Sequence, residues 1–178
     1  VRFTPLPSDI LPSNEVRKLY QDSDGYIWIP TYNGLARYDG YGAITYGMRD
    51  VSNGLFNTFV NVVAEDHDKN LWIGTEHGLF RLDKVSGNIV ADEYPELADC
   101  NIAVIRDVAG NIWVGTWGAG VVRLVNPLAP GPTRYVHYKH VPGRTHSLLD
   151  DIIYDIEENP EQNTIWIGGR SGLSILHD

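Results

Sequence analysis

The sequence of 178 residues contains a single cysteine, Cys100, so it can form neither an intramolecular disulfide nor a zinc site built on paired cysteines. It also lacks any apolar run near the roughly 20 residues that a membrane-spanning helix needs. Positive charge is scarce, with 14 lysines and arginines against 23 acidic residues and a formal net charge of −9. Phosphate groups are bound by basic surfaces, so this balance argues against nucleic acids and anionic membranes as partners.

Motifs for catalysis and metal binding are also missing. His137, His140 and His146 lie close together in the sequence, but residues three apart in a strand point to opposite faces. The stretches "DSDG" and "DHDKN" lack the twelve-residue calcium pattern with its closing glutamate, and favour hairpin turns. No phosphate-binding loop or nucleophile motif is present. We therefore expect no metal, no cofactor and no enzymatic activity.

The sequence does contain one phrase written four times, as in "DSDGYIWIPTYNGLARYD" from Asp22 and "DHDKNLWIGTEHGLFRLD" from Asp66. The repeats are marked by tryptophans spaced 44, 41 and 53 residues apart: Trp28, Trp72, Trp113 and Trp166. Periods of about 40–50 residues with aromatic and glycine markers are typical of β-propeller blades of four strands each. Helical repeats would instead show apolar residues at i, i+3, i+4 and i+7, which these segments do not.

Each unit divides into strands in the same way. An alternating strand such as "VNVVAED" precedes an acidic turn, and a nearly continuous apolar strand such as "LWIGT" indicates burial on both faces. A glycine before the third strand predicts a positive φ; these are Gly34, Gly78, Gly120 and Gly172. The repeated tryptophan is expected to pack between adjacent blades, the alternative being a ligand-stacking role.

These observations predict an all-β fold of about four four-stranded antiparallel β-propeller blades. The blade repeats are placed at about residues 14–47, 60–95, 100–140 and 150–178 of one partial propeller spanning 1–178. The last unit ends after its third strand. The stretch "VRFTPL" at residues 1–6 is therefore predicted to be a strand that completes a blade.

The pattern at residues 65–83, "EDHDKNLWIGTEHGLFRLD", resembles the two-component regulator propeller repeat. The segment from Leu11 to Tyr41 is similar to the start of the N-terminal extracytoplasmic sensor region of a hybrid two-component system histidine kinase. The resemblance implies rings of about seven blades, of which this chain would be a fragment. It also implies a periplasmic location, oligosaccharide sensing, and a kinase elsewhere in the parent chain, so that the fragment itself is non-catalytic.

In propellers, the loops between strands two and three and the loops leading into strand one line one face of the ring. The ligand-binding candidates in these loops are Tyr32, Asn33, Glu76, His77, Trp117, Arg170, Asn57 and His146. Trp117 lies outside the repeat template, so it is the strongest candidate for stacking on a sugar, or else it covers a neighbouring blade. A full site would use loops from every blade of a ring, so we expect weak or no carbohydrate binding by four units alone.

Two other functions remain open. Streptogramin lyases are propellers with similar repeats, and their chemistry needs a histidine base and a metal ion, whereas a structural propeller would bind only protein. An open arc of four blades would also leave two apolar faces uncovered. We therefore expect self-association, most simply as a two-fold dimer; a small closed ring is the alternative.

Overall fold

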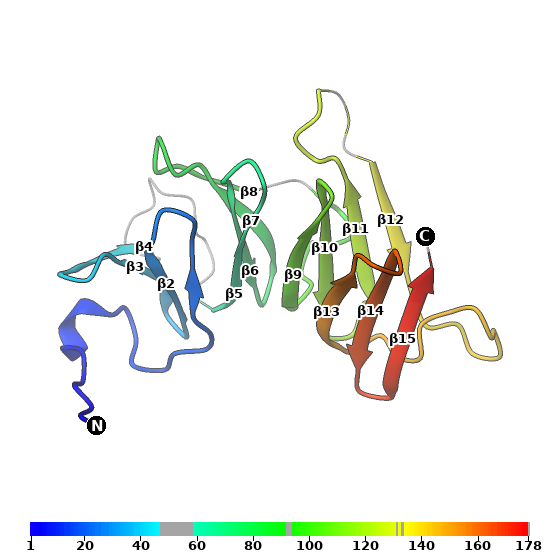
Figure 1. Ribbon diagram of the computed structural model, residues 1–178, viewed down its shortest axis with the longest axis horizontal. Coiled ribbons are helices and arrows are strands. Elements are labelled where there is room, and N and C mark those ends of the chain that lie inside the picture. Colours follow the sequence, from blue (N-terminus) through cyan, green and yellow to red (C-terminus); the bar gives the residue numbers. More distant parts are fainter. Residues whose placement is uncertain (47–58, 92–93, 131, 133, 178) are drawn as a thin grey trace.

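The computed structural model describes residues 1–46, 59–91, 94–130, 132 and 134–177. Apart from a short 3-10 helix, η1 (Ser8–Ile10), the regular elements of this part of the chain are all strands. They form four antiparallel sheets that follow one another in chain order along an open row (Figure 1). The predicted all-β architecture of repeated antiparallel sheets is confirmed.

Within each sheet the strands are neighbours in sequence order. The first sheet contains β1 (Tyr20–Gln21), β2 (Ile27–Thr31), β3 (Gly34–Tyr38) and β4 (Ala43–Tyr46). The second contains β5 (Val60–Glu65), β6 (Leu71–Thr75), β7 (Gly78–Leu82) and β8 (Ile89–Ala91). The third contains β9 (Ile102–Val108), β10 (Asn111–Thr116), β11 (Val121–Val125) and β12 (Arg134–Tyr138). The last has only β13 (Ile153–Asn159), β14 (Thr164–Gly169) and β15 (Gly172–His177).

The repeated tryptophans fill the spaces between sheets. Trp28, Trp72 and Trp113 are at most 1% exposed, and each belongs to the apolar cluster that joins its own sheet to the next one. The prediction that they pack between blades is confirmed for these three. Glycines 34, 78, 120 and 172 all have positive φ, as expected for the position before the third strand.

The first strand of the first unit is shorter than the sequence pattern predicts. The apolar alternation begins at Val16, but β1 has two residues, and Val16 is joined to Thr31 only by an isolated bridge. The cause is Pro30, which stands on β2 where the other units have glycine. Proline has no amide hydrogen to donate, so the ladder between β1 and β2 is interrupted beside it.

Residues 1–6 do not form the strand that the sequence analysis predicts. They are exposed and belong to no sheet, and the N-terminus lies at the opposite end of the row from β15 (Figure 1). The last sheet therefore keeps three strands. The reason is geometric, because the segment could complete this sheet within the same chain only if four blades closed into a ring.

Glycine near the end of the second strand allows neighbouring sheets to approach closely. A Cβ atom added to Gly115 would lie 2.5 Å from Cγ1 of Val104 and 2.7 Å from Cγ2 of Ile153, which is on the next sheet. Both neighbours are β-branched and have few alternative rotamers. Gly168 is the equivalent residue in the last sheet, and the nearest atom to its added Cβ is the Asp155 carbonyl oxygen at 3.9 Å.

We expect Gly115→Ala to lower the free energy of unfolding by about 1–3 kcal/mol, because the added methyl group overpacks the contact between the third and last sheets. The matched control, Gly168→Ala, should change it by less than about 0.5 kcal/mol. Urea unfolding of both variants measures the difference. Equal effects would contradict the close approach of the two sheets at Gly115.

Candidate ligand-binding rim

One end of the four sheets carries a repeated hydrogen bond that brings two sets of loops together. In the last three sheets, the residue after the second strand donates its amide hydrogen to the carbonyl just before the first strand, and in the first sheet the acceptor is the carbonyl just before the isolated bridge at Val16. The pairs are Tyr32–Glu15, Glu76–Phe59, Trp117–Asn101 and Arg170–Ile152, with N–O distances of 3.1, 3.2, 2.8 and 3.0 Å. The loops that the sequence analysis singles out therefore lie side by side within each sheet.

Further bonds join the loops of neighbouring sheets into one rim. Gly78 donates to the Cys100 carbonyl at 2.9 Å, which ties the second sheet to the start of the third. Gly118 and Gly120 both donate to the Asp151 carbonyl, which ties the third sheet to the start of the last. We refer to these connected loops, from residues 32–33, 76–78, 117–120 and 170–171 and the segments paired with them, as the rim.

Trp117 and Tyr154 form an exposed aromatic pair on the rim. Their ring centroids are 5.4 Å apart, and the side chains are 55% and 48% exposed. The backbone of Trp117 is fixed by its hydrogen bond to Asn101 and by a bridge to Ile152 on the next sheet. Trp117 thus contacts the neighbouring blade, as one reading of the sequence had it, yet more than half of its surface remains open.

Sequence reasoning missed Tyr154. The residue lies on β13, where Ile153 and Ile156 are buried. Four other residues of this strand are exposed: Tyr154, Asp155, Glu157 and Glu158. The available signal was an aromatic residue in "IIYDIEE" that stands between an isoleucine and an aspartate. The bridge that brings it beside Trp117 connects different repeats, so the sequence pattern alone did not reveal the pair.

The first two loops of the rim contain four of the other candidates. Tyr32 is 47% exposed, and its ring packs on Phe59 with the centroids 3.7 Å apart. Asn33 donates from its side-chain amide to the Pro12 carbonyl at 3.4 Å. Glu76 and His77 follow β6, and the His77 side chain is 59% exposed, with Nδ1 3.9 Å from an Asp99 carboxylate oxygen. These residues lie on the rim, and the partners of the Tyr32, Asn33 and His77 side chains are other residues, namely Phe59, Pro12 and Asp99.

At the other end of the rim, Arg170 is held by a buried carboxylate. Its Nε donates to Asp150 Oδ2 at 3.0 Å, and the Ser171 hydroxyl donates to the same oxygen. The Ser171 hydrogen bond, the Ile152 amide and Arg170 lower the pKa of Asp150 to about 2. The side chain of Arg170 is nevertheless 62% exposed, so part of its guanidinium still faces solvent.

The two remaining candidates do not join the aromatic pair. His146 lies in the loop before β13 and lines a hollow of about 820 Å³ between that loop and β15. Asn57 lies outside the described residues. Of the other histidines near His146, the rings of His137 and His140 are each within 2.7 Å of a backbone carbonyl oxygen, of Ala119 and Leu148 respectively, which gives both of them structural roles.

Three acidic side chains of the first two sheets lie close together, but a lysine ammonium group already occupies the space between them. Carboxylate oxygens of Asp22, Asp24 and Glu65 lie close enough to share a metal ion. The ammonium group of Lys84 contacts all three, at 3.3, 2.7 and 2.5 Å. Asp22 also accepts the amide hydrogens of Asp24 and Tyr26, which is the hairpin turn expected from "DSDG".

A groove of about 500 Å³ runs along the first strands of the sheets. Its polar lining includes Lys18, Tyr20, Glu65, Arg106 and Glu157. Histidine is absent from the described residues that line this groove.

Comparison with known families identifies the repeat. The model of the two-component regulator propeller matches residues 10–33 and 54–77. These two segments of the chain are therefore similar to that repeat. The tryptophans and glycines of these two repeats recur in the third and fourth sheets, which have the same strand order.

Solved structures with similar propeller repeats include extracellular domains from B. thetaiotaomicron. One, of BT4673, is described as part of a one component system and in a second structure as part of a hybrid two component system. The first of these structures is 29% identical with a TM-score of 0.76, and the match covers 93% of this chain and 22% of that one. The extracellular domain of the hybrid two component system BT3049 has a TM-score of 0.78 at 24% identity, covering 98% of this chain and 25% of that one. The chain therefore spans about a quarter or less of these domains.

The propeller fold is shared more widely. Streptogramin B lyase has a TM-score of 0.61 at 14% identity, with 93% of this chain and 55% of that chain covered, which shows a common fold alone. A comparison with curated proteins finds no match. The described residues contain no helix with the length and apolar character needed to cross a bilayer.

Proposed function

We propose that this chain is a ligand-recognising part of an extracytoplasmic propeller sensor in a hybrid two-component signalling protein. We propose oligosaccharides as its ligand class and recognition without catalysis as its role. The observation that carries the proposal is the exposed pair of Trp117 and Tyr154 on a rim held rigid by backbone hydrogen bonds. The similarity to extracellular domains of two component systems supports the signalling context.

An exposed aromatic pair suits a carbohydrate ligand for a physical reason. Sugar rings present apolar C–H faces that pack on aromatic rings, and their hydroxyl groups need polar partners. Trp117 and Tyr154 offer the apolar surface, while Asn101 and Asp151 belong to the same group of loops. The rings do not move far on binding, because the backbone that carries Trp117 is already fixed on both sides.

The parent protein would transmit the signal. In this proposal the rim lies in the periplasm, and a histidine kinase elsewhere in the parent chain responds to its occupancy. The chain spans 22% of the extracellular domain of BT4673, so further blades would complete the site and raise its affinity. Four blades alone are expected to bind weakly, with a dissociation constant on the order of 1 mM.

Ligand-observed NMR with a panel of neutral and acidic oligosaccharides tests this function. We expect saturation transfer to at least one oligosaccharide, and about tenfold weaker binding for Trp117→Ala and for Tyr154→Ala, which is a loss of about 1.4 kcal/mol. Tyr41→Ala is the matched control, because Tyr41 is an aromatic residue that is 99% exposed on the β3–β4 turn, away from the rim. Binding that survives both rim substitutions, or conversion of an oligosaccharide into products, would contradict the proposal.

A further inference from the structure

Two junctions between neighbouring sheets carry an aromatic pair on the rim. The pair of Trp117 and Tyr154 joins the third sheet to the last, and the pair of Tyr32 and Phe59 joins the first sheet to the second. Both pairs are built alike, because one ring follows the second strand of a sheet and the other lies at or just before the start of the first strand of the next sheet. Tyr32 is 47% exposed and Trp117 is 55% exposed, so both rings that follow a second strand are open to solvent.

An irregularity near the start of the first strand places a side chain on the rim in three of the sheets. The ladder between β13 and β14 shifts its register at Tyr154, which has no residue opposite it. The ladder between β5 and β6 shifts in the same way at Asn61. In the first sheet the equivalent residue is Arg17, directly after the isolated bridge at Val16. A bulge re-aims a side chain out of the regular alternation, and all three of these side chains contact the rim of a neighbouring sheet.

The junction between the first two sheets thereby combines Tyr32, Phe59 and Arg17. The guanidinium carbon of Arg17 lies 5.0 Å from the centroid of the Phe59 ring, which is a cation–π distance. The Arg17 side chain is 41% exposed, and its Nη2 lies 3.4 Å from a carboxylate oxygen of Glu15. An exposed ring beside a hydrogen-bond donor offers what a sugar unit needs, an apolar face for its C–H groups and a polar partner for its hydroxyl groups.

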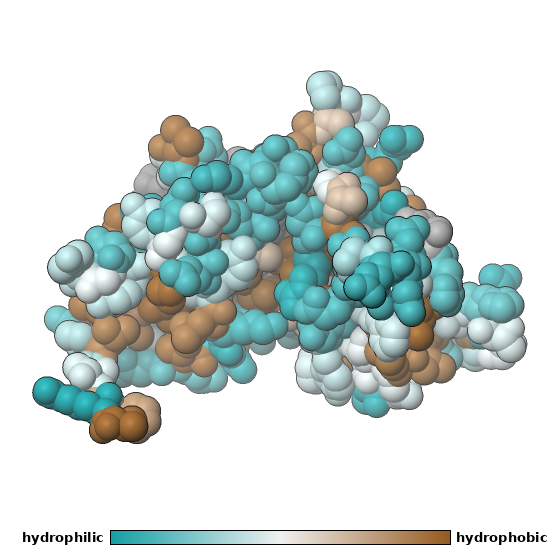
Figure 2. Space-filling model, in the orientation of Figure 1, coloured by the Kyte–Doolittle hydropathy of each residue, from teal (hydrophilic) through white to brown (hydrophobic). Residues whose placement is uncertain are grey.

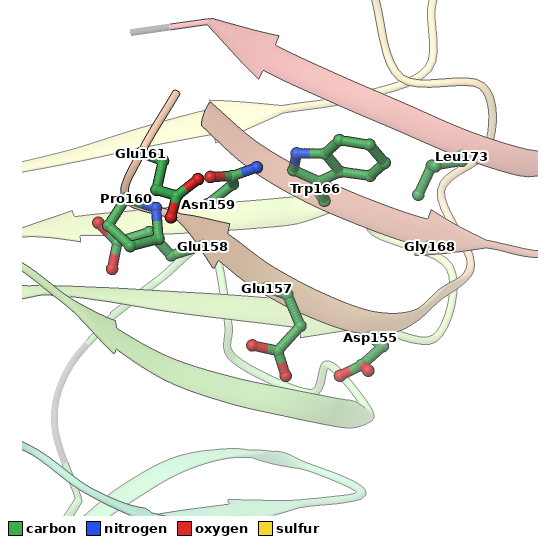
Figure 3. A pocket seen from close by; sticks show the side chains of 9 residues that line it. All are labelled: Asp155, Glu157, Glu158, Asn159, Pro160, Glu161, Trp166, Gly168 and Leu173. Atoms are coloured by element: carbon green, nitrogen blue, oxygen red, sulfur yellow. The ribbon is translucent and has the colours of Figure 1, made fainter. Parts of the chain in front are cut away.

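Both aromatic pairs stand on backbone that is already fixed. The carbonyl of Phe59 accepts the amide hydrogen of Glu76 at 3.2 Å, which ties the first pair to the loop after β6. Figure 3 shows Asp155 and Glu157 side by side on β13, the strand that carries Tyr154, and Arg106 of β9 binds both carboxylates at 3.3 and 2.9 Å. Rings on a fixed backbone lose little freedom when a ligand binds, so both pairs are suited to act as binding subsites.

The junction between the second and third sheets lies between the two pairs and carries polar side chains. Nδ2 of Asn61 donates to Oδ1 of Asn101 at 2.9 Å, and Glu76 stands where Tyr32 and Trp117 stand in their own sheets. Figure 2 shows hydrophobic and hydrophilic residues interspersed along the lower edge of the row, where the turn between β14 and β15 belongs to the rim (Figure 1). A polar strip between two aromatic pairs matches the hydroxyl groups along the middle of a sugar chain.

We infer that the rim binds one extended oligosaccharide across two subsites, with one sugar unit on the Trp117 pair and another on the Tyr32 pair. Packed sheets lie about 10 Å apart, so pairs that are two sheets apart are separated by roughly 15–20 Å. A single sugar ring is far shorter than this separation, so a disaccharide occupies one subsite and only a longer chain reaches both. The ligand class is that of the proposed function, on which this inference rests, and the second subsite selects for chain length. Two weak contacts joined by one chain give a higher affinity than either contact alone.

Saturation-transfer NMR with oligosaccharides of defined chain length tests the second subsite. Partial hydrolysates of plant and fungal polysaccharides are fractionated into disaccharide and hexasaccharide pools, and the apparent dissociation constant of each pool is measured. For the unaltered chain we expect the hexasaccharides to bind about tenfold more tightly than the disaccharides. Tyr32→Ala should remove this gain and leave the disaccharides within about twofold of their original affinity, because they remain bound at the Trp117 pair.

Three further variants give the comparison its controls. Tyr32→Phe keeps the ring and should keep the gain with chain length, as should Tyr41→Ala, which removes an exposed ring of the same sheet away from the rim. Arg17→Ala is a second substitution at an exposed side chain of the same subsite, and it should weaken the binding of hexasaccharides alone. The indole N–H signals of the buried Trp28 and Trp72, retained in every variant, show that the fold is kept.

The possible results separate the second subsite from the proposed function. Weaker binding of both pools by Trp117→Ala, with hexasaccharide binding unchanged in Tyr32→Ala and Arg17→Ala, would overturn the second subsite and leave the proposed function in place. Equal affinity of the two pools for the unaltered chain would also overturn the second subsite. Binding that neither Trp117→Ala nor Tyr32→Ala weakens, or the absence of binding to both pools, would overturn the second subsite together with the proposed function.

Discussion

Replacing Trp72 by alanine is expected to lower the free energy of unfolding by about 3–5 kcal/mol, the usual cost of removing a large aromatic residue from a core. The side chain is 1% exposed and lies in the cluster that joins the second and third sheets. Its indole N–H donates to Asp66 Oδ2 at 2.8 Å, so the substitution also leaves a buried carboxylate with one partner fewer. Neither sheet can collapse into the space, because both are held by their own ladders.

Trp166→Ala is the matched control for this prediction. Trp166 is partly exposed, and its indole donates to Thr164 rather than to an aspartate. Its loss should cost about 1–2 kcal/mol, in proportion to the smaller apolar area buried. Both substitutions are compared by urea unfolding under the same conditions. If the two tryptophans cost the same, the packing of each blade on the next is not what stabilises the fold.

Lys84→Met is expected to lower the free energy of unfolding by about 3 kcal/mol, because it leaves three carboxylates close together with no cation between them. The Lys84 side chain is 12% exposed, and its partners Asp22 and Glu65 are 0% and 7% exposed. Methionine keeps the apolar stem and removes only the charge. The loss is therefore attributable to the ion pairs that join the turn of the first sheet to the second sheet.

Lys69→Met provides the control for Lys84→Met. Lys69 also binds Asp24, at 3.2 Å, but its side chain is 60% exposed. A surface ion pair of this kind contributes about 0–1 kcal/mol, so we expect a small change in the free energy of unfolding. Thermal and urea unfolding at neutral pH and moderate salt would compare the two variants, and equal losses would contradict the buried role of Lys84.

The protonation state of Lys84 sets the pH range of this contribution. Burial disfavours its ammonium form, but hydrogen bonds with Asp24, Glu65 and Asp22 outweigh burial and raise the pKa above its ordinary value. A raised lysine pKa contributes stability that is complete below the unfolded value, about 10.4, and is lost as the pH rises through the folded value. The difference between Lys84→Met and the unaltered chain should thus be constant around pH 7, and on the alkaline side it should shrink only in strong alkali.

Much of the fold could be predicted from the sequence because the same residues recur at the same positions in each of the four repeats. Trp72 fills the space between two sheets, and the glycine before the third strand adopts a positive φ. Each repeat has these same two requirements, so the residues that meet them recur in the sequence. Pro30 departs from the repeat pattern, which has glycine at this position, but the shortening of β1 beside it was not predicted. That residues 1–6 form no strand could not be predicted, because such a strand would complete the last sheet only if four blades closed into a ring.

The site was predictable only in part, for a related reason. Trp117 could be singled out because it departs from the repeat template. Tyr154 could not, since it joins Trp117 through a contact between two different sheets, and the sequence pattern within one unit says nothing about such contacts. Arg170 was predicted for its place in a loop, but its ion pair with Asp150 depends on the fold of the turn before β13.

The central claim is that ligand recognition takes place on the rim at Trp117, and indole N–H resonances test it most directly. The chain has five tryptophans, and each gives one such signal in a nitrogen-15 correlation spectrum. The Trp117 signal is assigned by its loss in Trp117→Ala, and oligosaccharide is then titrated into the labelled protein. We predict that the Trp117 signal moves with increasing ligand while those of the buried Trp28, Trp72 and Trp113 stay in place. Saturable binding that leaves the Trp117 signal unmoved would contradict the account.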